Sequence, residues 1–416
     1  MRDGRVDLTT KGFPTVDRPI PLSEVAGQGW MLADLLPPVL ALRESALAHN
    51  IALMADYCER EGVELAPHGK TTMAPQLWRR QLDAGAWGIS AATVAQARVM
   101  LAAGVSHVLI ANEVTDPIGV AWIAAQLHDT DAEIVCSVDS RDGVAILGDA
   151  IDGGPRSLPV LVELGHPGGR TGCRTVEDAL EVARLVTTKP LLALAGATGF
   201  EGTIGEDRTP ARLDEVRAFL DGLARLTARL HADALVESED AWVSAGGSAF
   251  FDLVVERLGP SAGGADRLVL RSGRYVTHDA GEQAQVSPFA DREPEARFRA
   301  AIEVWGAVLS RPEPDLVILN LGRRDVPFDQ GLPIPFSLRR GSGEHLAVTG
   351  VLTVERLNDQ HAYCRIAPEI VTEIAIGPGD LVGCGVSHPC TAFDKWRVVP
   401  VLDDEDRVVD AVATYL

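Results

Sequence analysis

The chain has 416 residues, of which 46% are hydrophobic and 23% charged, a balance typical of a globular protein and not of a disordered one. This length exceeds one ordinary core and predicts two domains or a barrel with an appendage. The formal net charge of −21 argues against nucleic acid as a partner, because phosphate binding needs a clustered basic surface.

Residues 1–19 contain no apolar segment of signal-peptide length, and no later segment is long enough to span a bilayer. We therefore expect no membrane association. The six cysteines are sparse and widely scattered, which is typical of reduced thiols. Together these features predict a cytoplasmic location.

From residue 39 the sequence predicts a short strand, Val39–Leu42, and then an amphipathic helix that ends at Gly62. A single pattern then repeats: a continuous apolar run, a turn and a helical segment. Unalternating runs between helices indicate a parallel sheet buried on both faces. The eight runs begin at Val63, Trp87, His107, Glu133, Pro159, Leu191, Trp242 and Arg267.

Eight such repeats predict a (β/α)8 barrel, with residues 30–276 as its domain. An open doubly wound sheet is the alternative, but the chain lacks the G-x-G-x-x-G dinucleotide fingerprint. Beyond Thr277 the segments become strand-like, with turn residues between them and little helical periodicity. Residues 277–416, together with 1–29, are therefore predicted to form a second, mostly β domain.

A lysine follows the first of the eight runs. The chain has only four lysines, Lys11, Lys70, Lys189 and Lys395, and otherwise uses arginine for positive charge. A lysine amine can lose its proton and attack a carbonyl, whereas arginine stays protonated. Lys70 comes just after a strand, so we expect it at the barrel mouth, where catalytic groups lie. An exposed loop lysine is the alternative, and the adjacent His68 fits a structural role as well as a catalytic one.

Two glycine-rich turns follow later runs. In "ELGHPGGRTG", Glu163–Gly172, glycines would let the backbone approach a ligand and Arg170 would aim its rigid fork at an oxygen anion. "SAGGS", Ser244–Ser248, follows the seventh run, where barrels commonly hold phosphate through backbone N–H groups. The alternatives are a flexible turn with a surface arginine and an ordinary glycine turn.

The last motif is "GCGVSHPCTAF", Gly383–Phe393. His388 and Cys390 are two residues apart, so both point the same way in an extended segment. An imidazole beside a thiolate is half of a zinc site, with open positions for water or substrate. A buried cysteine beside a turn histidine is the alternative. Cys384 would be a third ligand only if it were not a buried apolar residue.

Together these motifs resemble the fold type III pyridoxal-phosphate enzymes, in the branch of eukaryotic-type D-serine dehydratases and D-threonine aldolases. They are similar in particular to bacterial D-serine deaminase-like amino acid deaminases. "PHGKT" looks like the cofactor-lysine motif, "RRQLDAGAWGISAAT" and "VLIANEV" like the next two barrel segments, "GGRTG" like the cofactor arginine loop, "SAGGS" like the phosphate loop and "SHPC" like the metal motif. The resemblance runs in order from about Gly29 to the C-terminus.

The resemblance implies that Lys70 carries pyridoxal phosphate covalently, with His68 beside it. Arg170 would lie near the phenolic oxygen of the cofactor. The remaining cofactor-binding residues would be Ser244, Gly246 and Gly247, the glycines through their backbone N–H groups to the phosphate. His388 and Cys390 would bind zinc. The resemblance also implies a head-to-tail homodimer in which the β domain of one subunit completes the site of the other.

Two departures from the family pattern bear on the reaction. D-threonine aldolases of this branch usually carry aspartate where this chain has Cys390, a soft ligand that selects zinc and matches the dehydratases. The dehydratases usually have an aromatic hydroxyl where "ATGFEGT" offers Phe200. The group that faces the pyridine nitrogen is therefore not identified by the motifs.

The resemblance thus implies a zinc-dependent D-serine dehydratase, or a relative that eliminates water and ammonia from a D-3-hydroxy amino acid. D-serine, D-threonine and 3-hydroxyaspartate all fit. A metal-dependent D-threonine aldolase is one alternative. Alanine racemase is another, but "SHPC" would then be idle. A non-catalytic pyridoxal-phosphate-binding protein is the third, and it would usually lack the large β domain.

Overall fold

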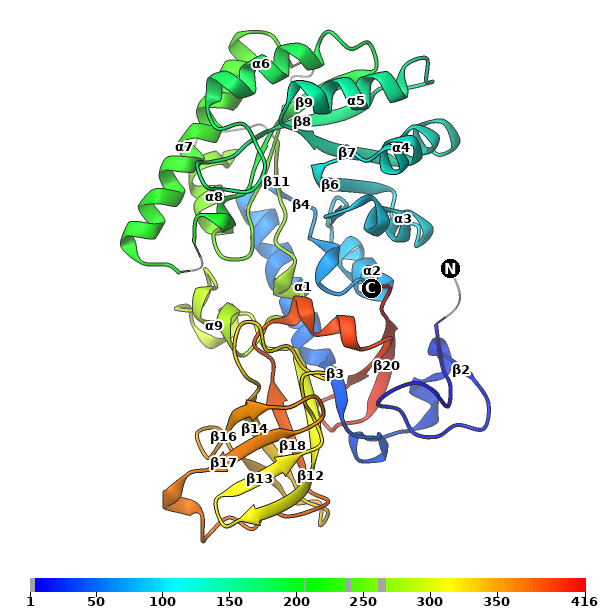
Figure 1. The fold of residues 1–416 in the computed structure, drawn as a ribbon, viewed down its shortest axis with the longest axis vertical. Helices are drawn as coiled ribbons and strands as arrows, with labels where there is room; N and C mark the ends of the chain where they lie inside the picture. The colour runs from blue at the N-terminus through cyan, green and yellow to red at the C-terminus, as the bar shows by residue number, and fades with distance from the viewer. Residues whose placement is uncertain (1–3, 206, 237–240, 261–266) are drawn as a thin grey trace.

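A computed structural model describes residues 4–416 except 206, 237–240 and 261–266. Its upper part in Figure 1 is an α/β unit and its lower part is built of antiparallel strands. None of the helices within the described ranges is both long and apolar enough to cross a membrane. The helices are α1 Glu44–Glu61, α2 Pro75–Asp83, α3 Val94–Ala102, α4 Pro117–Asp129, α5 Arg141–Ile151, α6 Val176–Val186, α7 Pro210–Ala232, α8 Phe251–Leu258 and α9 Glu282–Val286.

The α/β unit contains the eight predicted parallel strands, in the sheet order β4-β11-β10-β9-β8-β7-β6-β5. The two outer strands, β4 and β5, are also joined. The N–H of Trp87 donates to the carbonyl of Leu65 (2.8 Å), and that of Ser90 to Pro67 (3.0 Å), so the sheet curls back on itself. These strands are β4 Glu64–Leu65, β5 Ile89–Ala91, β6 His107–Glu113, β7 Glu133–Val138, β8 Leu158–Leu164, β9 Leu192–Gly199, β10 Trp242–Ala245 and β11 Arg267–Leu270.

Short polar residues start the helices between these strands. The side chains of Thr93, Asp116, Ser140 and Thr175 each accept a hydrogen bond from a backbone N–H in the first turn of the helix that follows. Such N-caps satisfy amides that would otherwise have no partner. Helix α1 ends at Gly62 with φ of 66°, which a residue without Cβ adopts at little cost. The four side-chain caps therefore set where α3, α4, α5 and α6 begin.

Alternating residues of the strands fill the interior of the barrel. Leu109, Val135, Leu161 and Val269 form a buried cluster there, while their neighbours pack outward against the helices. Trp242 joins this cluster, and the Arg267 guanidinium stacks 3.7 Å from its ring. The barrel is thus a packed core, and an open site can form only at its mouth.

The β domain is a ten-stranded, mostly antiparallel assembly in the order β15-β14-β18-β12-β13-β17-β16, with β3, β19 and β20 attached and β3 paired in parallel with β19. The strand β3, Val39–Arg43, pairs with β12 and β19 and belongs to this sheet, although residue 30 had been predicted as the start of the barrel domain. The other strands are β12 Ile302–Glu313, β13 Leu316–Leu319, β14 Ile334–Arg339, β15 His345–Ala347, β16 Leu352–Leu357, β17 Ala362–Ile366, β18 Leu381–Gly385, β19 Val398–Leu402 and β20 Val408–Ala413; a separate pair is β1 Arg5–Val6 with β2 Ile20–Pro21.

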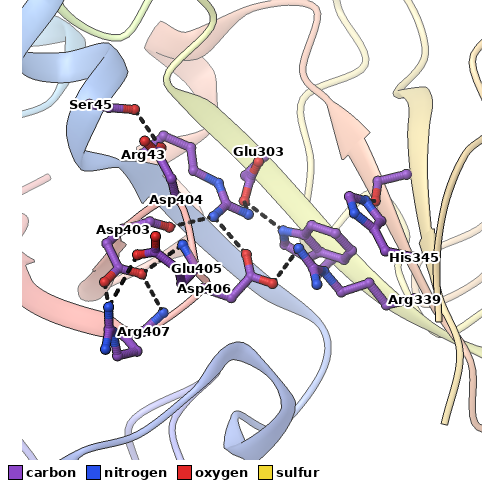
Figure 2. A network of polar contacts seen from close by, with 12 residues as sticks. Arg43, Ser45, Glu303, Arg339, His345, Asp403, Asp404, Glu405, Asp406 and Arg407 are labelled. Carbon is purple, nitrogen blue, oxygen red and sulfur yellow. Dashed lines mark hydrogen bonds and ion pairs between the residues drawn. The ribbon is translucent and has the colours of Figure 1, made fainter. Parts of the chain in front are cut away.

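A network of charges joins β3 to the rest of this sheet. Arg43 lies between two carboxylates, 2.6 Å from Glu303 and 2.7 Å from Asp406, and Arg339 also pairs with Asp406 (Figure 2). Both carboxylates are almost completely buried. Arg43 immediately precedes α1, so the network fixes the point at which the chain passes from the β domain into the barrel.

Candidate active site

A cavity of about 410 Å³ opens at the carboxyl ends of the barrel strands. Residues after β4, β9, β10 and β11 form its walls, and the loop after β18 of the β domain covers one side. Of the residues predicted from the sequence, the cavity brings together His68, Lys70, Gly247, His388 and Cys390. Segments far apart in the chain therefore meet at one place.

Lys70 lies in a short 3₁₀ turn directly after the first barrel strand, as expected. Burial lowers the pKa of its amine, and the nearby arginines lower it further, while the Cys390 thiolate opposes them. A lysine with a lowered pKa can act as a nucleophile or base near neutral pH. Lys70 is partly buried and lines the cavity, so the alternative of an exposed loop lysine is wrong.

His68 lies next to Lys70 and faces the same cavity. Its Nδ1 atom is buried, with no hydrogen-bond partner within the described ranges. Burial and the charge of Lys70 hold the pKa of this imidazole well below its ordinary value, so it is neutral at physiological pH. A buried polar atom without a partner fits a position at which a ligand supplies one.

The "SHPC" loop reaches Lys70 within the same chain. The Sγ atom of Cys390 lies 3.4 Å from the hydroxyl of Thr71, the residue after the lysine. Burial alone would raise the pKa of the Cys390 thiol, but hydrogen bonds with His388 and Thr71 bring it below its usual value. The thiol thus has the thiolate character that a metal ligand needs.

Asp329, which the motifs did not identify, orients His388. Its carboxylate lies 2.6 Å from Nδ1 of His388 and accepts a second hydrogen bond from Thr391 (2.9 Å). The hydrogen bond with Cys390, and then Asp329, raise the pKa of His388 to about 9. A carboxylate behind a metal-binding histidine commonly fixes which ring nitrogen faces the metal.

The donor set of this loop fits zinc in a catalytic rather than a structural site. His388 and Cys390 are borderline and soft donors that zinc prefers. Within the described part of the chain, no group of three or more His, Cys, Asp and Glu side chains is arranged to hold a metal. Cys384 is fully buried in β18. Two protein donors would leave the other positions to water or substrate.

The structure also fits pyridoxal phosphate beside Lys70. A Cβ on Gly273 would come within 2.4 Å of the His68 carbonyl, and one on Gly247 within 2.8 Å of the Phe200 ring. These two glycines therefore keep the cavity wall thin where the sequence turns after β10 and β11. Ser248 and Arg274 complete that wall.

Three predicted cofactor-binding residues do not line the cavity. Ser244 is fully buried, and its hydroxyl donates to the carbonyl of Val269 (3.0 Å). The N–H groups of Gly246 and Gly247 both donate to the carboxylate of Glu201. Arg170 is exposed, with its guanidinium 4.9 Å from the ring of Phe200. The roles of Ser244 and Arg170 toward the cofactor stay predictions, whereas Glu201 occupies the two glycine amides in this structure.

Arg271 is a buried arginine that sequence reasoning missed. It follows β11 and donates to Thr198 (2.8 Å), to the carbonyl of Ser244 (2.7 Å) and to the carbonyl of Gly199 (2.6 Å). These bonds tie the ends of three neighbouring strands together beneath the cavity. Its position directly after the last barrel strand was the signal that would have identified it.

Three acidic residues lie at the carboxyl ends of the barrel strands β6, β7 and β8. Glu113 ends β6, Asp139 follows β7 and Glu163 lies near the end of β8. Burial, and then the charge of Glu163, raise the pKa of Glu113 to about 9. Thr171 donates to Glu163 (2.9 Å) and the N–H of Gly172 to Asp139 (3.0 Å), so this cluster anchors the loop that carries Arg170.

Replacing Glu113 with glutamine should make stability less dependent on pH. The folded protein keeps a proton on Glu113 that the unfolded chain loses above about pH 4.5, its ordinary pKa. The free energy of unfolding should therefore fall as pH rises toward 9, by up to about 1.4 kcal/mol per pH unit. Glutamine has nearly the same size as glutamate but does not titrate. Urea unfolding between about pH 5 and pH 8 should give a smaller slope for Glu113→Gln. The exposed Glu181→Gln is the control, and equal slopes for Glu113→Gln and wild type would contradict this account.

Two segments of the chain match models of known protein families. Residues 42–251, half of the chain, match the model described as alanine racemase, N-terminal domain. The chain belongs to this family. Residues 301–402, which include His388 and Cys390, match a second model, described as a putative serine dehydratase domain. Both the family and the fold confirm the fold type III pyridoxal-phosphate architecture expected from the motifs, a parallel barrel followed by an antiparallel β domain.

Several proteins similar to this chain are named as aldolases or dehydratases, which are lyases. The chain is 28% identical to a D-threonine aldolase of an Arthrobacter species over 353 residues, which cover 85% of this chain and 86% of that protein. The crystal structure of a D-threonine aldolase from Filomicrobium marinum has a TM-score of 0.77 at 24% identity, covering 93% and 96% of the two chains. The D-threo-3-hydroxyaspartate dehydratase from Delftia sp. HT23 has a TM-score of 0.73 at 19% identity, covering 92% and 99%.

Proposed function

We propose that this protein is a pyridoxal-phosphate- and zinc-dependent lyase of D-3-hydroxy amino acids, and that its reaction is the dehydration of D-serine. One observation carries the proposal: Lys70 lines the same cavity as His388 and Cys390. Lys70 would be the base for the α-proton, and His388 with Cys390 would hold the Lewis acid. Both groups would therefore act on a substrate bound in this one cavity. The match of residues 301–402 to a putative serine dehydratase domain supports this choice.

Each of these residues would have a separate role in the reaction. Pyridoxal phosphate, when bound, supplies an electron sink for the bond broken at Cα. Lys70 would hold the cofactor and, once the substrate amine has taken its place, would receive the α-proton at Nζ. Its lowered pKa favours the neutral amine that this step needs.

His388 and Cys390 would hold zinc, which would supply Lewis acidity toward the β-hydroxyl of the substrate. Asp329 would hold the His388 ring in place through the Nδ1 contact. Hydroxide would leave from Cβ, and the released enamine would hydrolyse to pyruvate and ammonia when the substrate is D-serine. A histidine–cysteine pair selects zinc over the harder manganese and magnesium.

A D-threonine aldolase is the second candidate, because the Arthrobacter relative carries that name over most of both chains. The two reactions differ in the bond that breaks: Cβ–O with loss of ammonia in the dehydratase, Cα–Cβ in the aldolase. D- and L-serine, threonine and 3-hydroxyaspartate should be incubated with the protein, and ammonia, glycine and aldehydes assayed. Ammonia and pyruvate from D-serine support the proposal. Glycine and an aldehyde from D-threonine, without ammonia, would replace it by the aldolase.

Removal of zinc should abolish turnover but leave the cofactor in place. Chelation by dipicolinate should lower kcat by about 10²-fold or more, because a Lewis acid contributes several kcal/mol to the departure of the hydroxide. The visible absorption of the lysine-bound cofactor should stay unchanged, since Lys70 does not depend on the metal. Zinc should restore the activity and magnesium should not. Full activity in the chelated protein would rule out a catalytic zinc.

We also propose that the protein acts as a homodimer in the cytoplasm, as its family resemblance implies. Light scattering at several concentrations would report the oligomeric state. A monomer with full activity would contradict a site completed by a second subunit.

A further inference from the structure

The carboxylate of Glu201 reaches the turn Ser244–Ser248, which the sequence predicts to bind phosphate. Glu201 opens the 3₁₀ turn Glu201–Thr203 after β9 and is fully buried. Its Oε1 accepts from the N–H of Gly247 (2.5 Å) and its Oε2 from the N–H of Gly246 (3.2 Å). The carboxylate therefore fills the anion site formed by these two successive amides.

The backbone of this turn depends on an anion. Gly246 has φ of 91°, a conformation in which successive N–H groups converge on one point. Without an acceptor, the buried amide of Gly246 and the partly buried amide of Gly247 would lose their hydrogen bonds. A phosphate on the same two amides would meet the Glu201 carboxylate at close range, and two anions in a buried site repel each other strongly. Glu201 and a cofactor phosphate thus do not share these donors.

Residues that follow β10 and residues that follow β11 face the cavity. Gly247, Ser248 and Ala249 line it from the β10 side, and Gly273 and Arg274 from the β11 side. The orientation of Ser248 follows from the shape of the turn before it. We propose that Glu201 is a positioning residue: it binds the amides of Gly246 and Gly247 and so holds the following residue, Ser248, ready for the cofactor phosphate. This inference rests on the cofactor assignment of the proposed function.

Two forms of the cofactor separate this role from a general structural one. Pyridoxal 5′-phosphate and pyridoxal both react with Lys70, but only the first carries the phosphate. Glu201→Gln keeps the size of the side chain and has one acceptor oxygen, so one amide would face the N–H₂ group and lose its partner. The turn would then have to be ordered when phosphate binds, at a cost in affinity.

The full chain, freed of cofactor, should be titrated with each compound while the visible absorption is followed, without substrate. We expect Glu201→Gln to bind pyridoxal phosphate about 10-fold to 100-fold more weakly than wild type, and pyridoxal within about 2-fold. The exposed Glu181→Gln should change neither affinity. If Glu201→Gln does not fold, Glu201→Asp keeps the charge with a shorter reach, and the same selective loss is expected.

Three results would overturn the inference. Unchanged or tighter binding of pyridoxal phosphate would make Glu201 idle or a competitor of the phosphate. An equal loss for both compounds would make its role a general one. A wild-type protein that binds neither compound would overturn the cofactor assignment as well. Failure of the proposed reaction would leave the affinities as they are, because no substrate enters this measurement.

Discussion

Replacing Lys70 with alanine should abolish both the visible absorption of bound cofactor and the turnover of D-amino acids. Lys70 is the lysine that lines the cavity, so it supplies both the amine that holds the cofactor and the base for the α-proton. Loss of a positioned base alone costs about 10²-fold to 10⁴-fold in rate, and loss of covalent attachment adds to that. We expect kcat/KM to fall by at least about 10⁴-fold. Absorption spectra and ammonia release measure the two effects separately.

Lys189 provides the matched control. It is also a lysine of the barrel domain, but it pairs with Asp149 on the outside of the barrel (2.6 Å), far from the cavity. Lys189→Ala should keep the cofactor absorption and the wild-type rate. Lys70→Arg tests the chemistry further, because arginine keeps the charge but does not lose its proton. A Lys70→Ala protein that retained both colour and activity would refute the lysine assignment.

Much of the fold could be predicted from hydrophobic pattern alone. All eight apolar runs are barrel strands, because a strand buried on both faces is apolar at most positions and leaves a nearly continuous signal. Four of the described helices between them, α3, α4, α5 and α6, start at polar caps that are readable in the sequence. The strand β3 is different. Its apolar residues predicted a strand, but pairing with β12, some 260 residues later, is a long-range contact that no local pattern contains.

The candidate site divides in the same way. Lys70, His388 and Cys390 could be identified because a rare residue type or a short spacing marked them. Asp329 could not, since an aspartate in a loop is common and only the fold brings it to His388. The two turn glycines were identified by composition, but their amides face Glu201 because of the chain path after β9. Residue type is local information, whereas the direction of a side chain depends on tertiary packing.

Replacing Arg43 with methionine should destabilise the protein by about 3–5 kcal/mol. Arg43 lies between Glu303 and Asp406, whose side chains are only 8% and 6% exposed. Removing the cation leaves buried carboxylates without full compensation, which costs far more than the loss of a surface pair. Arg339 still pairs with Asp406 and the Trp305 indole still donates to Glu303, so we expect the lower end of this range. Urea unfolding measures the difference.

Arg407, an exposed arginine of the same network, is the control that distinguishes the effect of burial from the effect of charge (Figure 2). Its side chain is 59% exposed and pairs with Asp403 (2.9 Å) and Glu405 (3.2 Å), so Arg407→Met should cost at most about 1 kcal/mol. Adding Glu303→Gln to Arg43→Met should recover part of the loss, because the buried charge left behind is then removed. Equal costs at Arg43 and Arg407 would mean that the network contributes only surface electrostatics. The path of the chain from β3 into the barrel, and with it the register that delivers Lys70 to the mouth, would then depend on apolar packing alone.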